Sequence, residues 1–424
     1  MGQLMRLDHP LRRNTDASQK DESAFEEDPL AREFAFLLAC VRRYFQPETQ
    51  SPSAADLDWR KLVELAQQHA VAALFLREVR ERPDIPKDIL EDLRRRALEA
   101  AGFDLTLSAE LAELLGLFRK HEIQVVALKG PVLASTLYGT ASLRSSQDLD
   151  LLVHPNDLLR ANQVLAERGY HLESVLSWPT DSAYFRRRDS EISFSRKTAR
   201  QTDTLWVDLH WRLLPWYYPR SFDDRELWQN LSQVPVGGAL ASTLQPEKLL
   251  LFLCAHGTKH LWGRLGWICD VARLVQVEAS LDWTRVFDQA RQTETSRIVV
   301  LGLLLASELL GVDLPSPAVK YASMDWAHRA LATIKKRLHD QVFTPPAPIE
   351  SALLTRHVFE RTGQRVRFVL GDFLQPTDAE YEALKLPPIL YWLYYLFRPA
   401  RVASKYARVW FDVKGAETAA RPGR

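Results

Sequence analysis

Three aspartates in two short segments are the residues best placed to do chemistry. Asp148 and Asp150 lie in the segment Arg144–Val153, and Asp208 lies in Trp206–Trp211. Both segments alternate polar residues with leucine or valine, which predicts strands. Residues two apart in a strand point to the same face, so Asp148 and Asp150 should project together, and Asp208 can add a third carboxylate from a neighbouring strand. Convergent carboxylates suit Mg²⁺ or Mn²⁺ and can support phosphoryl or nucleotidyl transfer.

A turn upstream of these aspartates has the features of a phosphate-binding segment. Ile123–Leu128 predicts a short buried strand, and Val132–Tyr138 predicts a helix. Between them, Pro131 suits the first helical position, where a missing N–H is no loss. Gly130 lets the backbone approach a ligand closely, amides at a helix N-terminus bind phosphate, and Lys129 adds a point charge. This order of elements, with the Asp-x-Asp strand after it, indicates a triphosphate cradle that faces a metal pair.

These motifs, in this order, resemble the polymerase-beta-like nucleotidyltransferases, and more closely the uncharacterised bacterial nucleotidyltransferase family with a Leu-Lys-Gly motif. The segments that carry the resemblance are Leu128–Leu133, Leu137–Tyr138, Arg144, Asp148–Val153, Gly169–Tyr170, Val207–Trp211, His256–His260 and Trp267–Asp270. The resemblance covers residues 55 to 310. An Asp-x-Asp pair alone is common, but the order and spacing of all these segments together are specific.

The resemblance implies both a fold and an activity. The fold would be α+β: a polymerase-beta-like nucleotidyltransferase core, made of a small mixed sheet with helices, flanked by N-terminal and C-terminal helical regions. The activity would be Mg²⁺-dependent transfer of a nucleoside monophosphate from an NTP to an acceptor, with release of pyrophosphate. The wider superfamily has Gly-Ser where this chain has Lys129-Gly130. That serine helps to hold the triphosphate in the superfamily, so its replacement bears on nucleotide affinity and turnover.

The expected roles of the strongest candidates divide between metal and nucleotide. Asp148 and Asp150 would hold both metals, while Asp208 would complete the catalytic metal and help to deprotonate the acceptor. Charge stabilisation, rather than covalent catalysis, would then account for the rate. Lys129 and Gly130 would contact the nucleotide.

Two further residues each have two interpretations. Arg144, four positions before Asp148, could contact the triphosphate or form an ion pair that holds the loop. His210 shares a strand face with Asp208 by parity. It could contact the acceptor or orient Asp208, or it could simply pack at the sheet edge.

Two histidines four residues apart share one face of a predicted helix. The spacing of His256 and His260 can suit a metal, but the second position of the motif is not glutamate and no third ligand is adjacent. The competing interpretation is a pair of polar residues at a domain interface. The family resemblance favours a cleft-facing role, with Lys259 and His260 near phosphate or acceptor. Asp270 would either anchor its helix or bind acceptor hydroxyls.

The composition is that of an ordinary globular protein. A chain of 424 residues allows two or three domains, and a net charge of +1 excludes a global field for nucleic acid. Basic residues are dispersed among acids, so stable nucleic-acid binding is not expected. The cysteines Cys40, Cys254 and Cys269 lie in apolar contexts without metal spacing, which predicts buried free thiols in a reducing cytoplasm. No secretory signal is visible, and no apolar run reaches the roughly 20 residues that span a bilayer.

The pattern along the chain predicts four regions. They are a disordered tail at 1–28, a helical subdomain at 29–121, the catalytic core at 122–236 and a helical domain at 237–424. Within the second region, residues 87–121 predict one long helix. Apolar residues recur on it at helical spacing at Leu105, Ala109, Ala112, Leu115 and Phe118.

The C-terminal region contains an aromatic segment with bases after it. Pro387–Phe397 is rich in tyrosine, tryptophan and leucine, and Arg398, Arg401, Lys405 and Arg408 follow. The simpler interpretation is a helix whose aromatic face packs on the helical domain. The alternative is peripheral contact with a membrane, since aromatic residues with flanking bases suit lipid headgroups.

Three functional hypotheses follow. The first is transfer of a nucleotidyl group to an unidentified hydroxyl or amine on a small molecule, sugar or protein. The second is a catalytically inactive nucleotide-binding or antitoxin-like regulatory module on the same fold, which the missing Gly-Ser serine favours and the complete set of carboxylates disfavours. The third is a two-metal phosphohydrolase, which would normally need more histidine and aspartate ligands than this chain offers.

Overall fold

The structure is a computed structural model. It describes residues 29–140, 142–174, 190–198, 203–218, 225–340 and 348–404. The predicted tail at 1–28, and Lys405 and Arg408 at the other end, lie outside this part of the chain.

A five-stranded mixed sheet forms the centre of the fold, as predicted. Its strand order is β1-β2-β5-β4-β3; β2 and β5 run parallel, and every other neighbouring pair is antiparallel. Most of these strands are short and rich in valine and leucine, because both faces of the central strands are covered. The bounds are Val125–Ala127 (β1), Leu149–Val153 (β2), His171–Leu172 (β3), Glu191–Lys197 (β4) and Thr204–His210 (β5).

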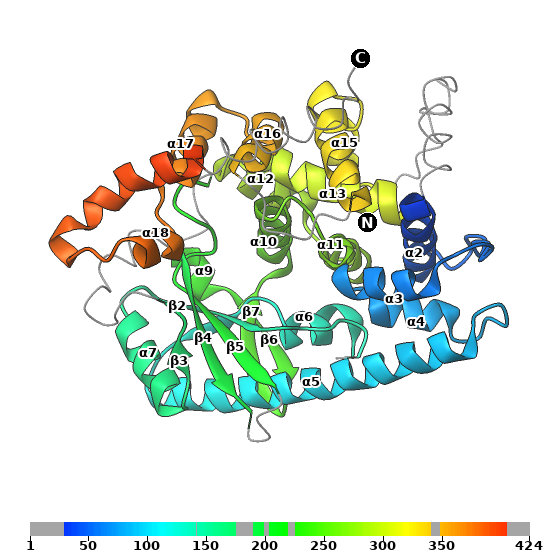
Figure 1. The fold of residues 1–424 in the computed structure, drawn as a ribbon, viewed down its shortest axis with the longest axis horizontal. Helices are drawn as coiled ribbons and strands as arrows, with labels where there is room; N and C mark the ends of the chain where they lie inside the picture. Colours follow the sequence, from blue (N-terminus) through cyan, green and yellow to red (C-terminus); the bar gives the residue numbers. More distant parts are fainter. Residues whose placement is uncertain are drawn as a thin grey trace, which may run out of the picture.

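One face of the sheet is apolar and lies against the long helix α5 (Lys87–Lys120), which runs beneath the sheet in Figure 1. The helix α7 (Leu158–Glu167) belongs to the same apolar cluster. Alternation along β2 sends Leu149, Leu151 and Val153 into this cluster, while Asp150 falls on the opposite face. The sheet therefore presents its acidic side away from α5.

The long helix was predicted correctly, and its buried face was predicted in part. Leu115 and Phe118 of the predicted stripe are buried against the sheet, but Leu105 and Ala109 are exposed, and Leu107, Leu111 and Leu114 are buried there in their place. The predicted apolar face of the helix overlaps only part of its buried face, because leucines recur on more than one side of this helix.

A second sheet is a hairpin of β6 (Leu231–Val236) and β7 (Ala239–Leu244). Its two-residue loop is Gly237-Gly238, both at positive φ, which is the conformation that such tight hairpins require. The hydroxyl of Thr243 donates to the carbonyl of Ala127 at 2.7 Å and so fixes the hairpin to β1. This hairpin was not predicted from the sequence.

The other face of the main sheet is covered by helices. The segment after β1 forms α6 (Pro131–Leu133) and continues as a wider π-type turn, η2 (Ala134–Tyr138). Beyond the hairpin lie α10 (Pro246–Lys259), α11 (Leu265–Val277), α12 (Trp283–Gln292) and α13 (Ser296–Leu310). These last four helices fall in the region 237–424, which was predicted to be helical from its apolar periodicity.

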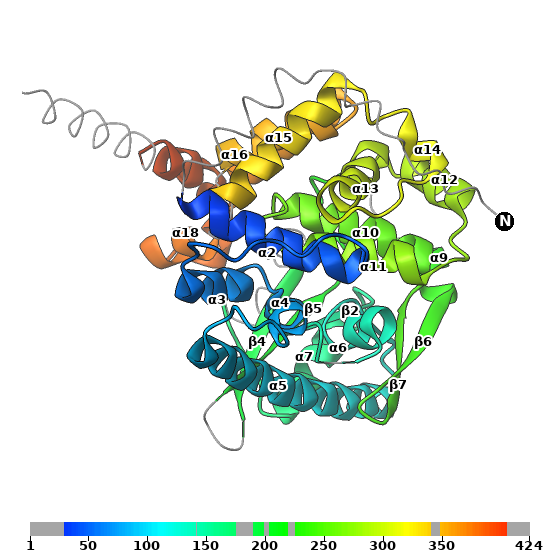
Figure 2. The same cartoon turned by 90° about the vertical axis from the view of Figure 1, so that its right-hand side faces the viewer.

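The N-terminal helices pack against this C-terminal group. They are α2 (Pro29–Phe45), α3 (Trp59–Gln68) and α4 (Ala72–Val79), and Figure 2 shows α2 beside α13. The guanidinium of Arg42 donates to the carbonyl of Leu309 at 2.8 Å. The apolar side chains of both groups form one cluster, so the two helical regions share a core. The domain boundaries at 121 and 236 stay predictions.

The remaining elements are helices of various lengths. They are α9 (Arg225–Gln229), α14 (Ser316–Val319), α15 (Asp325–His339), α16 (Pro348–Val358), α17 (Thr362–Leu374), α18 (Asp378–Ala383), η3 (Pro388–Leu393) and a helix over 394–404. All of them except α9 fall in the region 237–424, which was predicted to be helical. In the part of the chain that the structure describes, no helix is long and apolar enough to cross a membrane. The three cysteines are buried and free, as predicted.

The aromatic segment near the C-terminus has two distinct faces. Tyr394 is buried, whereas Ile389, Trp392 and Leu396 are exposed. Arg398 and Arg401 both pair with the fully buried carboxylate of Glu380. These two bases are thus turned inward rather than toward a headgroup layer, and peripheral membrane contact stays a prediction that rests on the exposed apolar face.

Candidate active site

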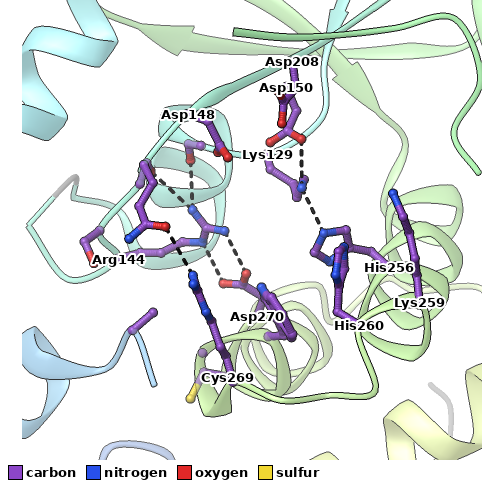
Figure 3. A pocket seen from close by; sticks show the side chains of 18 of the residues that line it. Lys129, Arg144, Asp148, Asp150, Asp208, His256, Lys259, His260, Cys269 and Asp270 are labelled. Atoms are coloured by element: carbon purple, nitrogen blue, oxygen red, sulfur yellow. Dashed lines mark hydrogen bonds and ion pairs between the residues drawn. The ribbon is translucent and has the colours of Figure 1, made fainter. Parts of the chain in front are cut away.

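A cavity of about 410 Å³ opens between the acidic face of the sheet and helices α10 and α11 (Figure 3). All ten residues predicted for the site line it. They are Lys129, Gly130, Arg144, Asp148, Asp150, Asp208, His210, Lys259, His260 and Asp270. His256 also lines the cavity, in line with the cleft-facing interpretation of the two histidines, and the structure adds lining residues that were not predicted, among them Glu191 and Trp267.

The three aspartates come together as the strand pattern predicted. Asp150 in β2 and Asp208 in β5 are register partners across the parallel pair. Asp148 precedes β2 by one residue, and all three carboxylates line the cavity. Burial and the negative charge of Asp150 raise the pKa of both Asp148 and Asp208. The ionised forms of these two carboxylates are therefore disfavoured here, and a bound cation would stabilise them.

Asp150 is the carboxylate with cationic partners. One oxygen, Oδ1, accepts from the ammonium of Lys129 at 2.8 Å and from Nε2 of His210 at 3.2 Å. The other, Oδ2, is buried and has no hydrogen-bond partner. Burial alone would raise the pKa of Asp150, but Lys129 and His210 hold it well below its usual range. Asp150 also raises the pKa of Lys129 against the effect of burial, so the pair stays charged.

Glu191 is a residue of this cluster that the sequence analysis missed. It is the register partner of His210 across the antiparallel pair β4 and β5, and its carboxylate contacts Nδ1 of His210 at 3.1 Å and Nζ of Lys259 at 2.9 Å. Burial acts to lower the pKa of His210, but the carboxylates of Glu191 and Asp150 outweigh this effect and raise the pKa to about 9. His210 is therefore a cation held between two carboxylates. The register of β4 against β5 is what places Glu191 beside His210, and no short sequence motif indicates this contact.

The Lys-Gly turn has a backbone reason for its glycine. Gly130 has φ of 66° and ψ of −137°, and a Cβ atom added there would lie 3.0 Å from the carbonyl oxygen of Asp148. Pro131 occupies the first helical position, as predicted. Glycine at position 130 thus lets the turn lie directly against the backbone that leads into the aspartate strand. This contact sets the direction in which the Lys129 side chain points.

Arg144 and Asp270, which the sequence assigned to different ligands, contact each other. The guanidinium of Arg144 donates to both carboxylate oxygens of Asp270, at 2.8 and 3.0 Å, and the hydroxyl of Tyr138 donates to the same carboxylate at 3.1 Å. In the loop that follows, the backbone N–H of Ser146 donates to buried Asp104 of α5 at 2.7 Å. These contacts match the loop-holding interpretation of Arg144 and the anchoring interpretation of Asp270.

The end of α10 supplies the opposite wall of the cavity. His256 accepts a hydrogen bond from Lys129 at 3.0 Å, and the rings of His256 and His260 both lie against Trp267. Burial, with the nearby charge of Lys129, holds the pKa of His256 well below its usual range. Burial and the charge of Lys259 lower the pKa of His260 to about 3. Both imidazoles therefore favour the neutral form, and the positive charge at this end of α10 comes from Lys259, which pairs with Glu191.

A tight turn joins α10 to α11 and fixes that wall. Leu261 and Trp262 both have φ of 50°, a left-handed conformation that non-glycine residues seldom adopt. The Trp262 side chain is fully buried, and a Cβ atom at Gly257 would lie 2.5 Å from its ring. Packing of the indole over this glycine holds the strained turn, which brings the start of α11 back to the cavity.

The carboxylate oxygens of the cavity suit Mg²⁺ or Mn²⁺, although they are not arranged around one point as the ligands of a bound ion are. Carboxylate oxygens are the ligands these ions prefer. Among the described residues, Oδ2 of Asp150 has no hydrogen-bond partner, and burial with the charge of Asp150 raises the pKa of Asp148 and Asp208, so a cation here would stabilise their ionised forms. Across the described ranges, however, no three histidine, cysteine, aspartate or glutamate side chains already converge as ligands of one ion.

Comparison with known proteins identifies the family. The chain resembles, over 51% of its length and 96% of the other chain, an antigenic nucleotidyltransferase-like protein from Paracoccidioides brasiliensis, with 15% identity and a TM-score of 0.33. No curated protein matches it. The model of the uncharacterised nucleotidyltransferase family matches residues 55–311, close to the extent of the resemblance seen in the sequence. Since this match covers more than half of the 424 residues, the chain belongs to the uncharacterised nucleotidyltransferase family.

Proposed function

We propose that this chain is a Mg²⁺- or Mn²⁺-dependent enzyme that transfers a nucleoside monophosphate from an NTP to a hydroxyl or amine. The acceptor would be a small molecule, a sugar or a protein side chain. The observation that supports this most is the pairing of Asp150 with Asp208 on adjacent parallel strands, with Asp148 beside them at the same cavity. Family membership supports nucleotidyl transfer in general.

In this proposal the three aspartates hold the divalent cation. A bound Mg²⁺ would supply charge stabilisation for the transferred phosphoryl group. The acceptor oxygen or nitrogen bonds to the α-phosphorus, the bond from that phosphorus to pyrophosphate breaks, and Asp208 accepts the acceptor proton. The raised pKa of Asp208, caused by burial and Asp150, suits a proton acceptor.

The cationic and polar residues of the cavity would position the two substrates. Lys129, at the start of the Lys-Gly turn, would contact the triphosphate. Lys259 and His260 lie on the opposite wall and would contact phosphate or acceptor. Arg144 and Asp270 would act through their ion pair, by holding the loop before Asp148 against α11.

A second candidate is a nucleotide-binding regulatory module without turnover. The ion pair between Lys129 and Asp150 favours it, because this contact occupies a carboxylate that catalysis requires. In that case the ammonium of Lys129 would permanently take the place of a metal ion at Asp150. The nucleotide would then bind without a metal ion.

Calorimetry with each of the four NTPs, with and without Mg²⁺, tests both candidates. The enzyme predicts that one NTP binds in a Mg²⁺-dependent way and that Asp148→Asn removes this dependence. Asp325→Asn is the matched control, because Asp325 is exposed, pairs with Arg329 on its own helix and does not line the cavity.

The same titrations can reject the proposal. Binding that is equal with and without Mg²⁺ would support the regulatory module. The absence of binding for every NTP would exclude both candidates. Where one NTP binds, its α-³²P form then serves to search for the labelled acceptor.

A further inference from the structure

Lys129 has two partners in the structure, and one of them belongs to the aspartate cluster. Its ammonium lies 2.8 Å from Oδ1 of Asp150 and 3.0 Å from Nε2 of His256 (Figure 3). The side chain is largely buried, at 15% exposure, and that of Asp150 is at 2%. An ion pair of this kind is strong because little water screens it.

This contact and a divalent cation exclude each other. The two hydrogen bonds to Oδ1 already come from Lys129 and His210. An ion at about 2.1 Å from that oxygen would lie within about 5 Å of the ammonium, where two positive charges repel strongly. The aspartate cluster therefore cannot accept an ion on this oxygen while Lys129 stays in place.

The other cations near the cluster are held by a different anion. Glu191 contacts both His210 and Lys259, so each has a carboxylate partner besides the aspartates. Among the described residues, no second carboxylate contacts Lys129, and its second partner, His256, is neutral. Asp148 and Glu191 raise the pKa of Lys129 through their charge without contacting it. A lysine side chain on a flexible stem can turn to a new anion. Lys129 is thus the cation on Asp150 that no second carboxylate holds in place, and a new anion that replaces the charge of Asp150 can draw it away.

We infer that Lys129 is the resident counter-ion of Asp150, and that a divalent cation binds tightly to the cluster, through both oxygens of Asp150, only when a triphosphate draws Lys129 away. The inference rests on the proposed function, in which the triphosphate binds at the Lys-Gly turn. It adds a coupling to that function: free metal binds weakly, and metal and nucleotide bind tightly only as a pair. Binding of each then strengthens binding of the other.

Two titrations of the full-length protein test this coupling separately. Mn²⁺ alone is titrated by electron paramagnetic resonance, and inorganic tripolyphosphate alone is titrated by calorimetry in EDTA. We expect wild-type protein to bind Mn²⁺ alone weakly, with Kd of about 1 mM or more. Lys129→Met should tighten Mn²⁺ about tenfold or more and weaken tripolyphosphate by a similar factor. A variant that merely disturbs the fold would weaken both.

Two controls sharpen the comparison. Lys259→Met removes a positive charge that contacts Glu191 and not Asp150, so it should change Mn²⁺ affinity much less than Lys129→Met. Lys129→Gln repeats the test with a polar side chain, and circular dichroism checks that each variant is folded.

Three results would overturn the inference. They are submillimolar binding of Mn²⁺ alone by wild-type protein, unchanged Mn²⁺ affinity in the Lys129 variants, and an equal gain in Lys259→Met. Adding Asp148→Asn to Lys129→Met separates this failure from that of the proposed function. If the added change leaves Mn²⁺ affinity unaltered, the ion does not bind at the aspartates and both fail; if it weakens Mn²⁺, the metal site stands whichever way Lys129 behaves.

Discussion

Arg144 and Asp270 form a two-pronged ion pair across 126 positions of the sequence. The guanidinium nitrogens Nε and Nη2 donate to the two carboxylate oxygens at 2.8 and 3.0 Å. Arg144 belongs to the loop that leads into the aspartate strand, and Asp270 belongs to α11. Arg144 also donates to the carbonyl of Gly130 at 3.4 Å. One guanidinium thus connects the Lys-Gly turn, the aspartate loop and the helical wall of the cavity.

Breaking this ion pair should cost stability. Asp270→Asn leaves the largely buried Arg144 without its counter-charge, so the free energy of unfolding should fall by about 3 kcal/mol. Urea denaturation measures the loss. The exposed pair Arg329–Asp325 is the control, and Asp325→Asn should change stability little. An equally small loss for Asp270→Asn would show that the contact does not hold the loop.

Gly130→Ala should damage the fold more than most glycine substitutions. The added methyl would meet the Asp148 carbonyl at 3.0 Å, and φ of 66° is unfavourable for alanine. A loss of about 2 kcal/mol or more is expected from strain of this kind. Gly102→Ala is the matched comparison, since it is in α5 with nothing within 4 Å, and there alanine should stabilise by about 0.5–1 kcal/mol. Thermal melts that rank the two variants in the opposite order would refute this account.

Asp104 should make stability depend on pH in a specific direction. Burial raises the pKa of Asp104 from 3.8 to about 6, so the folded chain keeps this proton at a pH where the unfolded chain has lost it. Its contribution to stability is therefore lost as pH rises from about 4 to about 6, and it is constant above that. Asp104→Asn mimics the protonated form. The free energy of unfolding of this variant should exceed that of wild type by an amount that grows as pH rises through this window. Urea denaturation at several pH values measures the difference.

Asp92 on the same helix provides the opposite case. Arg95 and Arg96 lower the pKa of Asp92, so its contribution is present at neutral pH and is lost as pH falls. The free energy of unfolding of Asp92→Asn should therefore fall further below that of wild type as pH rises. This is the reverse of the trend expected for Asp104→Asn. The same trend in both variants would contradict the assignment of Asp104.

The bases of the C-terminal helix should matter for stability rather than for lipid binding. Arg398 and Arg401 both pair with Glu380, whose side chain is fully buried. Replacing both with glutamine leaves that carboxylate uncompensated, and a loss of about 3 kcal/mol is expected. Flotation with anionic vesicles measures lipid binding in parallel. A double variant that keeps its stability but loses vesicle binding would show that these arginines face a membrane.

The strand pattern was enough to predict the aspartate cluster. Alternation places Asp148 with Asp150, and places Asp208 with His210, on one side of their strands, because the period of a strand is two. The partner of Lys129 could not be predicted in this way. Its contact with Asp150 depends on where the Gly130 turn lies against the strand, which is a tertiary relationship. Glu191 was missed for a similar reason, since its role comes from its register opposite His210.

Helical regions were predicted well where apolar residues recur regularly, as in the stretch that holds α11, α12 and α13. The hairpin at Gly237-Gly238 was missed although a two-residue glycine loop is a usable signal. In α5, leucines on several faces hid which of them meet the sheet, and the partner surface decides that choice. Local pattern thus predicts elements well, whereas side-chain partners require the assembled fold.

The shared core of the two helical regions has a consequence for synthesis of the chain. Side chains of α2, such as Leu37 and Val41, are buried in a cluster that also needs Val299 and Leu310 of α13. Those partners leave the ribosome more than 250 residues after α2 does. During that interval the apolar face of α2 has no native surface to cover it, so a nascent chain that stops before α13 presents a ready target for chaperones.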